Sequence, residues 1–244
     1  MTKKQDVIIN CSNLHKGGAI TVASSFIDCL SKKNYDDMRI SLLLSEKVFK
    51  NINKSETNLS KFKNVKIINN FGLRMLFFNY FKHFNSIDIV FSVFGPSYNL
   101  NNKFKHIIGL ADPFIIYKDN FYLQNKASLK FKIINKLIVF IKNIFLYNTD
   151  TLIVETDRVK KEIMKNKNFQ RKKIYVVSNS LNAIFFNKKY WKRFDFKVSR
   201  KSLKLGIISR NYPHKNLEIL PSVKRILENK FKIKVEIFVT FNDK

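Results

Sequence analysis

Residues 203–217 read Leu-Lys-Leu-Gly-Ile-Ile-Ser-Arg-Asn-Tyr-Pro-His-Lys-Asn-Leu. The apolar run from Leu203 to Ser209 predicts a buried strand, and a short turn containing proline then leads to Lys215 at the start of a helix. Arg210 and Lys215 would lie beside that helix N-terminus, and two cations in such a position suit a diphosphate group. The alternative is a pair of solvated cations in a chain rich in them. The order of strand, turn and helix favours the diphosphate interpretation.

Short apolar runs alternate with helical patterns along most of the chain. Strands are expected at residues 7–11, 40–44, 65–69, 87–94, 106–110, 151–155, 174–178 and 234–241, and helices at 19–30, 73–84, 121–148, 157–167 and 216–229. Strands that are separated by helices predict right-handed βαβ units and a parallel sheet covered on both faces. The expected fold class is therefore α/β, with a doubly wound, Rossmann-like sheet.

Residues 187–202 interrupt this alternation with a basic, aperiodic stretch. Such a stretch is typical of a linker between domains. We expect a first domain at residues 1–186, a linker at 187–202, and the first βαβ unit of a second Rossmann-like domain at 203–244. On this interpretation the second domain is truncated at its C-terminal side.

The amino-acid composition excludes several classes of protein. The 244 residues are 45% hydrophobic and include 24 Phe, which is enough for a packed core. The two cysteines, Cys11 and Cys29, form neither a disulfide framework nor a metal-ligand pattern. No secretory signal is apparent, and no apolar run approaches the roughly 18 residues of a membrane span. A cytoplasmic protein is expected.

The formal net charge of +28 admits nucleic acid, an anionic membrane surface or a phosphorylated substrate as partners. Compositional bias is the alternative, because lysines are scattered through every segment. No compact basic and aromatic motif of a nucleic-acid-binding module is present, so nucleic acid is not an expected partner.

Several residues would follow strands at the carboxyl edge of the sheet, where open α/β sheets bind ligands. Gly17 and Gly18 lie between the first strand and the first helix, and the free amides of a helix start attract anions. Asp112 follows the strand at 106–110 and could orient a sugar hydroxyl, although an aspartate before proline is also a common turn residue. Glu155 ends the strand at 151–155 and would point into the same crevice.

The helix around residues 126–146 carries an apolar stripe with interleaved lysines. Such a stripe usually faces a core and leaves its lysines in solvent, and this is the arrangement we expect. The alternative is a basic amphipathic helix that lies on an anionic bilayer.

Three segments, in this order, resemble those of glycosyltransferases with two Rossmann-like domains, the GT-B architecture. Gly17-Gly18-Ala19 is similar to the glycine loop of the acceptor-side domain. Residues 177–186, which include Asn179, are similar to the segment just before the donor domain. Residues 206–216 are similar to the motif whose Arg and Lys hold the donor diphosphate. Within this architecture the chain most resembles the large retaining family four, which includes many enzymes of bacterial surface polysaccharides.

The resemblance implies transfer of a sugar from a nucleotide-diphosphate sugar to a hydroxyl acceptor, with Arg210 and Lys215 as diphosphate ligands. It implies no bound metal or cofactor, a lipid-linked saccharide as acceptor, and a location at the inner face of the plasma membrane. Family members commonly carry a histidine where this chain has Ala111, so Asp112 is the candidate catalytic residue. A pair of spaced glutamates that holds the donor is absent, and an inactive or partial enzyme is therefore expected. A non-catalytic scaffold at a membrane surface is the alternative.

Overall fold

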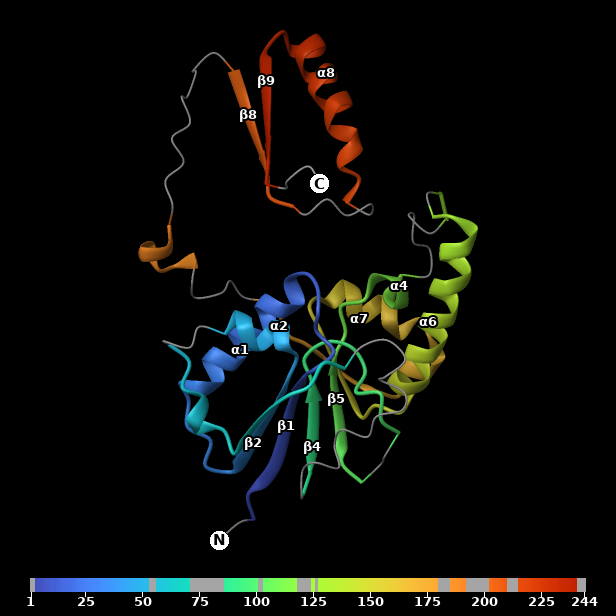
Figure 1. The fold of residues 1–244 in the computed structure, drawn as a ribbon. Helices are drawn as coiled ribbons and strands as arrows, with labels where there is room; N and C mark the ends of the chain where they lie inside the picture. The colour runs from blue at the N-terminus through green and yellow to red at the C-terminus, as the bar shows by residue number, and fades with distance from the viewer. Residues whose placement is uncertain are drawn as a thin grey trace. The chain divides into compact units, whose positions relative to one another are not determined.

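The structure is a computed structural model that describes residues 3–52, 56–70, 86–100, 103–117, 124–125, 127–179, 185–191, 202–209 and 215–240 (Figure 1). The chain divides into two compact units, Met1–Tyr190 and Trp191–Lys244. The division between the units lies at residues 190 and 191. The domain limits 1–186 and 203–244, with a linker between them, remain a prediction.

The first unit contains a seven-stranded sheet whose paired strands are all parallel. Its strands are β1 (Gln5–Cys11), β2 (Met38–Leu44), β3 (Asn64–Ile67), β4 (Ile89–Ser92), β5 (Lys105–Gly109), β6 (Thr151–Val154) and β7 (Lys173–Val176). The order across the sheet is β3-β2-β1-β4-β5-β6-β7, so the direction of winding reverses between β1 and β4. This is the order of a doubly wound, Rossmann-like sheet, and it confirms the expected fold class.

Helices connect these strands. They are α1 (Gly18–Ser31), α2 (Glu46–Asn51), α4 (Pro113–Ile116), α6 (Leu129–Tyr147) and α7 (Asp157–Met164), with short 3-10 turns at Leu59–Lys61, Lys167–Phe169 and Lys188–Tyr190. Right-handed crossovers that run in opposite directions place their helices on opposite faces of a sheet. In Figure 1, α1 and α2 accordingly lie to one side of the strands and α6 lies to the other.

Hydroxyl side chains fix where three of these helices begin. The side-chain oxygens of Ser45, Ser128 and Thr156 accept hydrogen bonds from the backbone amides of the first turns of α2, α6 and α7. The helix expected at residues 121–148 corresponds in part to α6, which begins after Ser128, whereas residues 121–123 and 126 lie outside the described residues. The helix expected at 73–84 lies outside the described residues.

The core of the first unit has two large parts. One lies between α1, α2 and the strands β1 and β2, where Ile27, Leu42, Leu44 and Val48 are fully buried. The other lies between β5, β6, β7 and the helices α4 and α7, and it includes Leu146 from the last turn of α6. None of the described helices combines the length and apolar character needed to cross a membrane.

The described residues of the second unit form two parallel strands, a 3-10 turn and a helix. The strand β8 (Ser202–Ile207) pairs in parallel with β9 (Lys234–Val239). Between them lie a 3-10 turn at Leu217–Ile219 and the helix α8 (Leu220–Phe231). This is the βαβ unit expected from residues 203–241.

Gly109, at the end of β5, lies close against the backbone of the segment that follows β4. A Cβ atom at this position would lie 1.9 Å from the carbonyl oxygen of Val93. The amide of Gly95 also donates to the carbonyl of Gly109 over 2.9 Å, so the two chain segments cannot separate without losing that bond. Only glycine fits at the end of β5.

We predict that Gly109→Ala lowers the free energy of unfolding by about 3 kcal/mol, because backbone atoms must move to admit the methyl group. Gly206→Ala in β8 is the matched control, since a Cβ there meets no atom within 4 Å. Urea unfolding of both variants measures the difference. Equal stability of the two variants would contradict the close approach.

At the amino edge of the sheet, a buried carboxylate on β1 contacts β2 and the segments just before β3 and β4. Asp6 is 5% exposed and accepts hydrogen bonds from Arg39, Lys63 and Ser86. Burial alone would raise the pKa of Asp6, but the hydrogen bonds from Lys63, Ser86 and Arg39 outweigh it and lower the pKa well below its usual value. The charged form is therefore favoured by folding.

Because the folded pKa of Asp6 lies below its unfolded value, its contribution to stability is present above about pH 4 and is lost as the pH falls below that. We predict that Asp6→Asn lowers the free energy of unfolding at neutral pH by about 3 kcal/mol and flattens its dependence on pH in acid. Glu162→Gln, which breaks the exposed pair with Lys165, is the control and costs about 0.5 kcal/mol. If the free energy of unfolding of Asp6→Asn fell in acid as steeply as that of wild type, the role of Asp6 would be refuted.

Candidate functional site

The loops after β1 and β4 lie where the winding of the sheet reverses. Hydrogen bonds from side-chain amides connect these two segments. The Asn10 amide donates to Ser92 Oγ over 3.0 Å, and Asn10 Oδ1 accepts from the backbone and hydroxyl of Ser12. The Asn13 amide donates to the carbonyl of Phe94 over 2.8 Å. Open α/β sheets bind ligands at this reversal, outside the carboxyl ends of the strands. The two loops therefore form a fixed floor for a candidate site.

Unused hydrogen-bonding capacity remains at this floor. The buried oxygen Asn13 Oδ1 and the buried nitrogen Asn70 Nδ2 have no hydrogen-bond partner among the residues that the structure describes. Buried polar atoms of this kind are uncommon in folded proteins. Sequence reasoning did not select Asn10, Asn13 or Ser92, and no motif marks them.

Gly17 and Gly18 lie where the sequence places them, at the start of α1. Gly17 is the residue before the helix, with φ 70° and ψ −163°, a combination that is essentially restricted to glycine. It provides no side-chain cap, so the first amides of α1 are left available to a ligand. Lys16, which precedes it, is exposed. An uncapped helix start beside an exposed lysine is an arrangement that favours an anion.

His15 contributes little positive charge to this loop. Burial lowers the pKa of His15, and a hydrogen bond to the backbone of Asn70 opposes that shift only in part. The imidazole is therefore mainly neutral at neutral pH. Lys16 carries the full positive charge of this loop, and the amides at the start of α1 add partial positive charge.

Asp112 has both carboxylate oxygens engaged. Oδ1 accepts from the backbone amide of Phe114 over 3.0 Å, which caps α4, and Oδ2 pairs with Lys142 Nζ of α6 over 2.6 Å. The turn role that the sequence offered as an alternative is therefore present. The catalytic role is a separate prediction that this geometry leaves untested. Lys142, 30 residues away in sequence, carried no signal by which to predict the pair.

Tyr98 lies close to the same pair. Its ring packs on Phe145 at 5.2 Å between centroids, and its backbone has φ 51°, which non-glycine residues rarely adopt. Burial, with a smaller contribution from the charge of Asp112, raises the pKa of Tyr98 to about 12. The hydroxyl thus stays protonated and can donate a hydrogen bond across the neutral pH range.

Glu155 and Asn179 are brought together from neighbouring strands. The Asn179 amide donates to Glu155 Oε1 over 2.6 Å, just beyond the ends of β7 and β6. Both residues line a cavity of about 300 Å³, which is also lined by Ser25 and Cys29 of α1. The two cleft candidates therefore share one site at the carboxyl edge.

The diphosphate candidates belong to the second unit. Lys215 is exposed and lies just before the turn at Leu217–Ile219 that leads into α8. Asn216 follows it in a left-handed conformation, with φ 52°. Arg210 lies outside the described residues.

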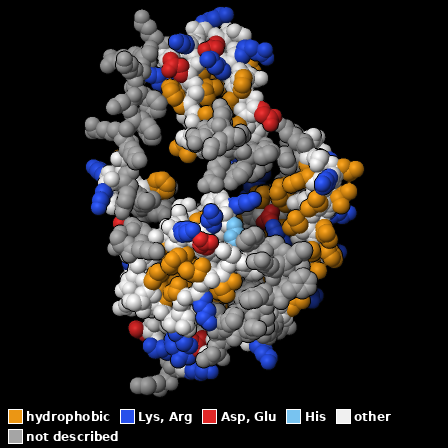
Figure 2. Space-filling model, viewed as in Figure 1, with side chains coloured by type: hydrophobic (Ala, Val, Ile, Leu, Met, Phe, Trp, Pro, Cys, Tyr) orange, Lys and Arg blue, Asp and Glu red, His pale blue; other side chains and the backbone are white. Residues whose placement is uncertain are grey.

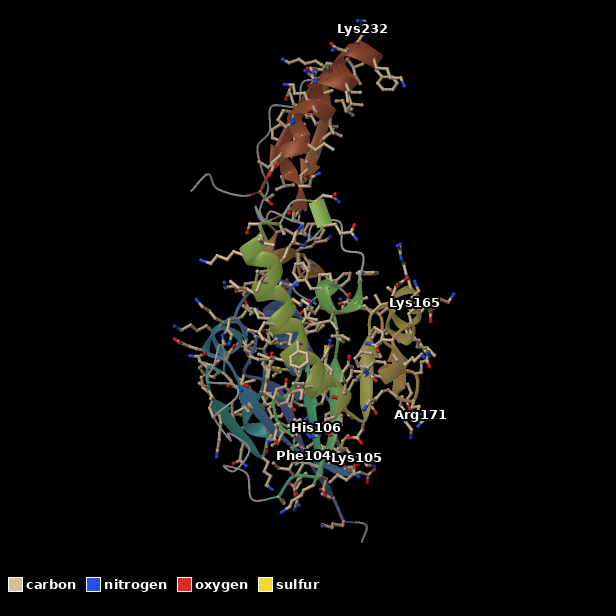
Figure 3. The ribbon with its side chains drawn as sticks, turned by 90° about the vertical axis from the view of Figure 1, so that its right-hand side faces the viewer. Phe104, Lys105, His106, Lys165, Arg171 and Lys232 are labelled. Atoms are coloured by element: carbon tan, nitrogen blue, oxygen red, sulfur yellow. The ribbon has the colours of Figure 1, made fainter. Side chains whose placement is uncertain are left out.

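A polar cavity lies at the opposite edge of the sheet. His106, near the start of β5, lines it (Figure 3). The Nδ1 atom of His106 is 3.0 Å from Ser97 Oγ. Lys172 lines this cavity and donates to the carbonyls of Tyr147 and Thr149, which satisfies the C-terminal end of α6. Lys172 thus has a structural role here. Within the described ranges, no cluster of three His, Cys, Asp or Glu residues could bind a metal ion.

Comparison with known proteins gives little further information. No family profile and no curated protein matches the chain. A solved structure, an S. aureus MnaA-UDP co-structure, is similar with a TM-score of 0.46 and 12% sequence identity. The match covers 100% of this chain, which spans 64% of the length of that one. A likeness of this strength identifies neither a substrate nor an activity.

We predict that Gly17→Ala destabilises the first unit by about 2 kcal/mol through backbone strain alone, because a Cβ there meets no atom within 4 Å. Gly18→Ala is the control. Its position is helical and equally open, so the change should be neutral or slightly stabilising. Thermal unfolding distinguishes the two. A Gly17→Ala variant as stable as wild type would show that the loop readily adopts another conformation.

Proposed function

We propose that this chain belongs to a retaining glycosyltransferase of the GT-B architecture that uses a nucleotide-diphosphate sugar. The observation that carries the proposal is the βαβ unit of residues 202–239, in which Lys215 follows a parallel strand and precedes a helix. A loop in this position directs helix amides and cationic side chains at a phosphate-bearing ligand.

Arg210 and Lys215 would act on the donor. A guanidinium can grip two diphosphate oxygens at once, whereas an ammonium adds a point charge. Both would offset the negative charge that grows on the diphosphate as the sugar leaves. Cations of the protein then take the part that a metal ion takes in other phosphate chemistry, and the reaction would need no cofactor.

The first unit would receive the acceptor. Its carboxyl edge offers the uncapped start of α1 at Gly17 and Gly18, the cavity beside Glu155 and Asn179, and the protonated hydroxyl of Tyr98. These groups can hydrogen-bond saccharide hydroxyls. Asp112 remains the candidate catalytic residue, and to act as a base it would have to exchange Lys142 for the acceptor hydroxyl.

The biological setting we propose is assembly of a cell-surface polysaccharide on a lipid-linked acceptor. Such an acceptor lies in a membrane, and the formal net charge of +28 would attract the chain to the anionic inner leaflet. A non-catalytic role at the membrane surface is the remaining alternative, and nucleotide binding distinguishes the two.

We predict that the purified chain binds uridine or guanosine diphosphate more tightly than the corresponding monophosphate. Isothermal titration calorimetry measures both. Arg210→Gln and Lys215→Gln should each weaken diphosphate binding about tenfold and leave monophosphate binding nearly unchanged. Lys230→Gln, in the last turn of α8, is the matched control. Equal affinity for diphosphate and monophosphate in the wild-type chain would refute a diphosphate site.

A further inference from the structure

The helix α6 exposes a continuous apolar stripe, which corrects the expectation that this stripe faces the core. Large apolar residues on one side of α6 are 42–75% exposed: Leu129, Ile133, Leu137, Phe140 and Ile144. At 3.6 residues per turn they fall within an arc of about 80° and extend over about 22 Å. We call these five residues the α6 stripe. Figure 2 shows apolar side chains gathered over this helix.

The helix is held to the unit by its last turns. Leu146 is fully buried, Phe145 packs on Tyr98, and Lys142 pairs with Asp112. These contacts fix the orientation of α6 on the unit. The exposed stripe is therefore a stable feature of the surface.

Positive charge borders the stripe and negative charge is absent from it. Lys130, Lys132 and Lys136 are exposed and flank the stripe on its two sides. Residues 120–149 contain five lysines and neither Asp nor Glu. An exposed apolar stripe between lysines is the pattern of a helix that lies in the interface of an anionic bilayer.

A second copy of the chain is a poor occupant for this surface. Two such helices side by side would bring their lysines together with no carboxylate on either helix to pair with them. The stripe is also a ridge on a convex helix. A bilayer accepts a ridge because its acyl chains flow around the apolar side chains, whereas lysines beside the ridge extend to the headgroups.

We propose that α6 docks this protein on anionic membranes, with the α6 stripe inserted among the acyl chains and Lys130, Lys132 and Lys136 against the headgroups. This goes beyond the proposed glycosyl transfer, because it assigns a lipid-binding surface that needs neither donor nor acceptor. It also orients the first unit on the membrane, since the helix is fixed to that unit through Leu146 and Lys142.

Vesicle sedimentation of the full chain tests the proposal. We expect binding to vesicles of equimolar phosphatidylcholine and phosphatidylglycerol, and far weaker binding to phosphatidylcholine alone. The triple variant Ile133→Gln, Leu137→Gln, Phe140→Gln should lose binding on the order of 100-fold. The triple variant Lys130→Gln, Lys132→Gln, Lys136→Gln should lose a similar factor at low salt. Circular dichroism checks that both fold, as expected for changes at exposed positions.

A matched control separates docking from net charge. Lys161→Gln, Lys167→Gln, Lys173→Gln removes three exposed lysines from other elements and should change binding less than about threefold. Insertion is read with Phe140→Trp in a Trp191→Phe background. Its fluorescence should shift to the blue and be quenched by brominated lipid, which a purely electrostatic contact would not produce.

Four results would overturn the proposal. The first is that the wild-type chain does not bind anionic vesicles, and the second is that the stripe variant binds them as well as wild type. The third is that the control variant loses as much binding as the α6 lysine variant. The fourth is that the chain forms a dimer without lipid and that the stripe variant abolishes this dimer. Nucleotide titration of the same variants keeps the two proposals apart. If the stripe variant no longer binds vesicles but still binds diphosphate, the substitutions affect membrane docking and not the nucleotide site.

Discussion

The parallel pairing of β1 with β4 is the constraint on which the candidate site of the first unit depends. Chain segments 82 residues apart meet there, and the Asn10 amide joins Ser92 across the junction. The reversal of winding at this pair makes the following loops diverge, which opens the crevice. The bond from Asn13 to Phe94 then holds the loops at a fixed separation. The start of α1 at Gly17 gains its position from this junction.

Much of the fold could be predicted from local pattern. Short apolar runs gave the strands, because strands buried on both faces need little alternation of polarity. Thr156 caps α7 because its hydroxyl satisfies a free amide at the helix start. The limits of α6 were less well predicted, since the pattern suggested one helix from residue 121 and α6 begins after Ser128.

The site could be predicted only in part. Glu155 was found because it ends a strand at the carboxyl edge, whereas Asn179 was named only because its segment resembles that of a known family. The partner of Asp112 was not, because the pairing with Lys142 depends on how α6 crosses α4. The α6 stripe shows most clearly what the spacing of apolar residues in a sequence cannot predict. Its spacing is the same whether the stripe faces a core or a membrane, and only its exposure decides between them.

The central claim is that cations at the start of the second unit bind a diphosphate. A crystal structure of this chain with a bound nucleotide-diphosphate sugar tests it most directly. We expect diphosphate oxygens within hydrogen-bonding distance of the Arg210 guanidinium and the Lys215 ammonium, with the sugar beyond them. A diphosphate bound away from both side chains would contradict it.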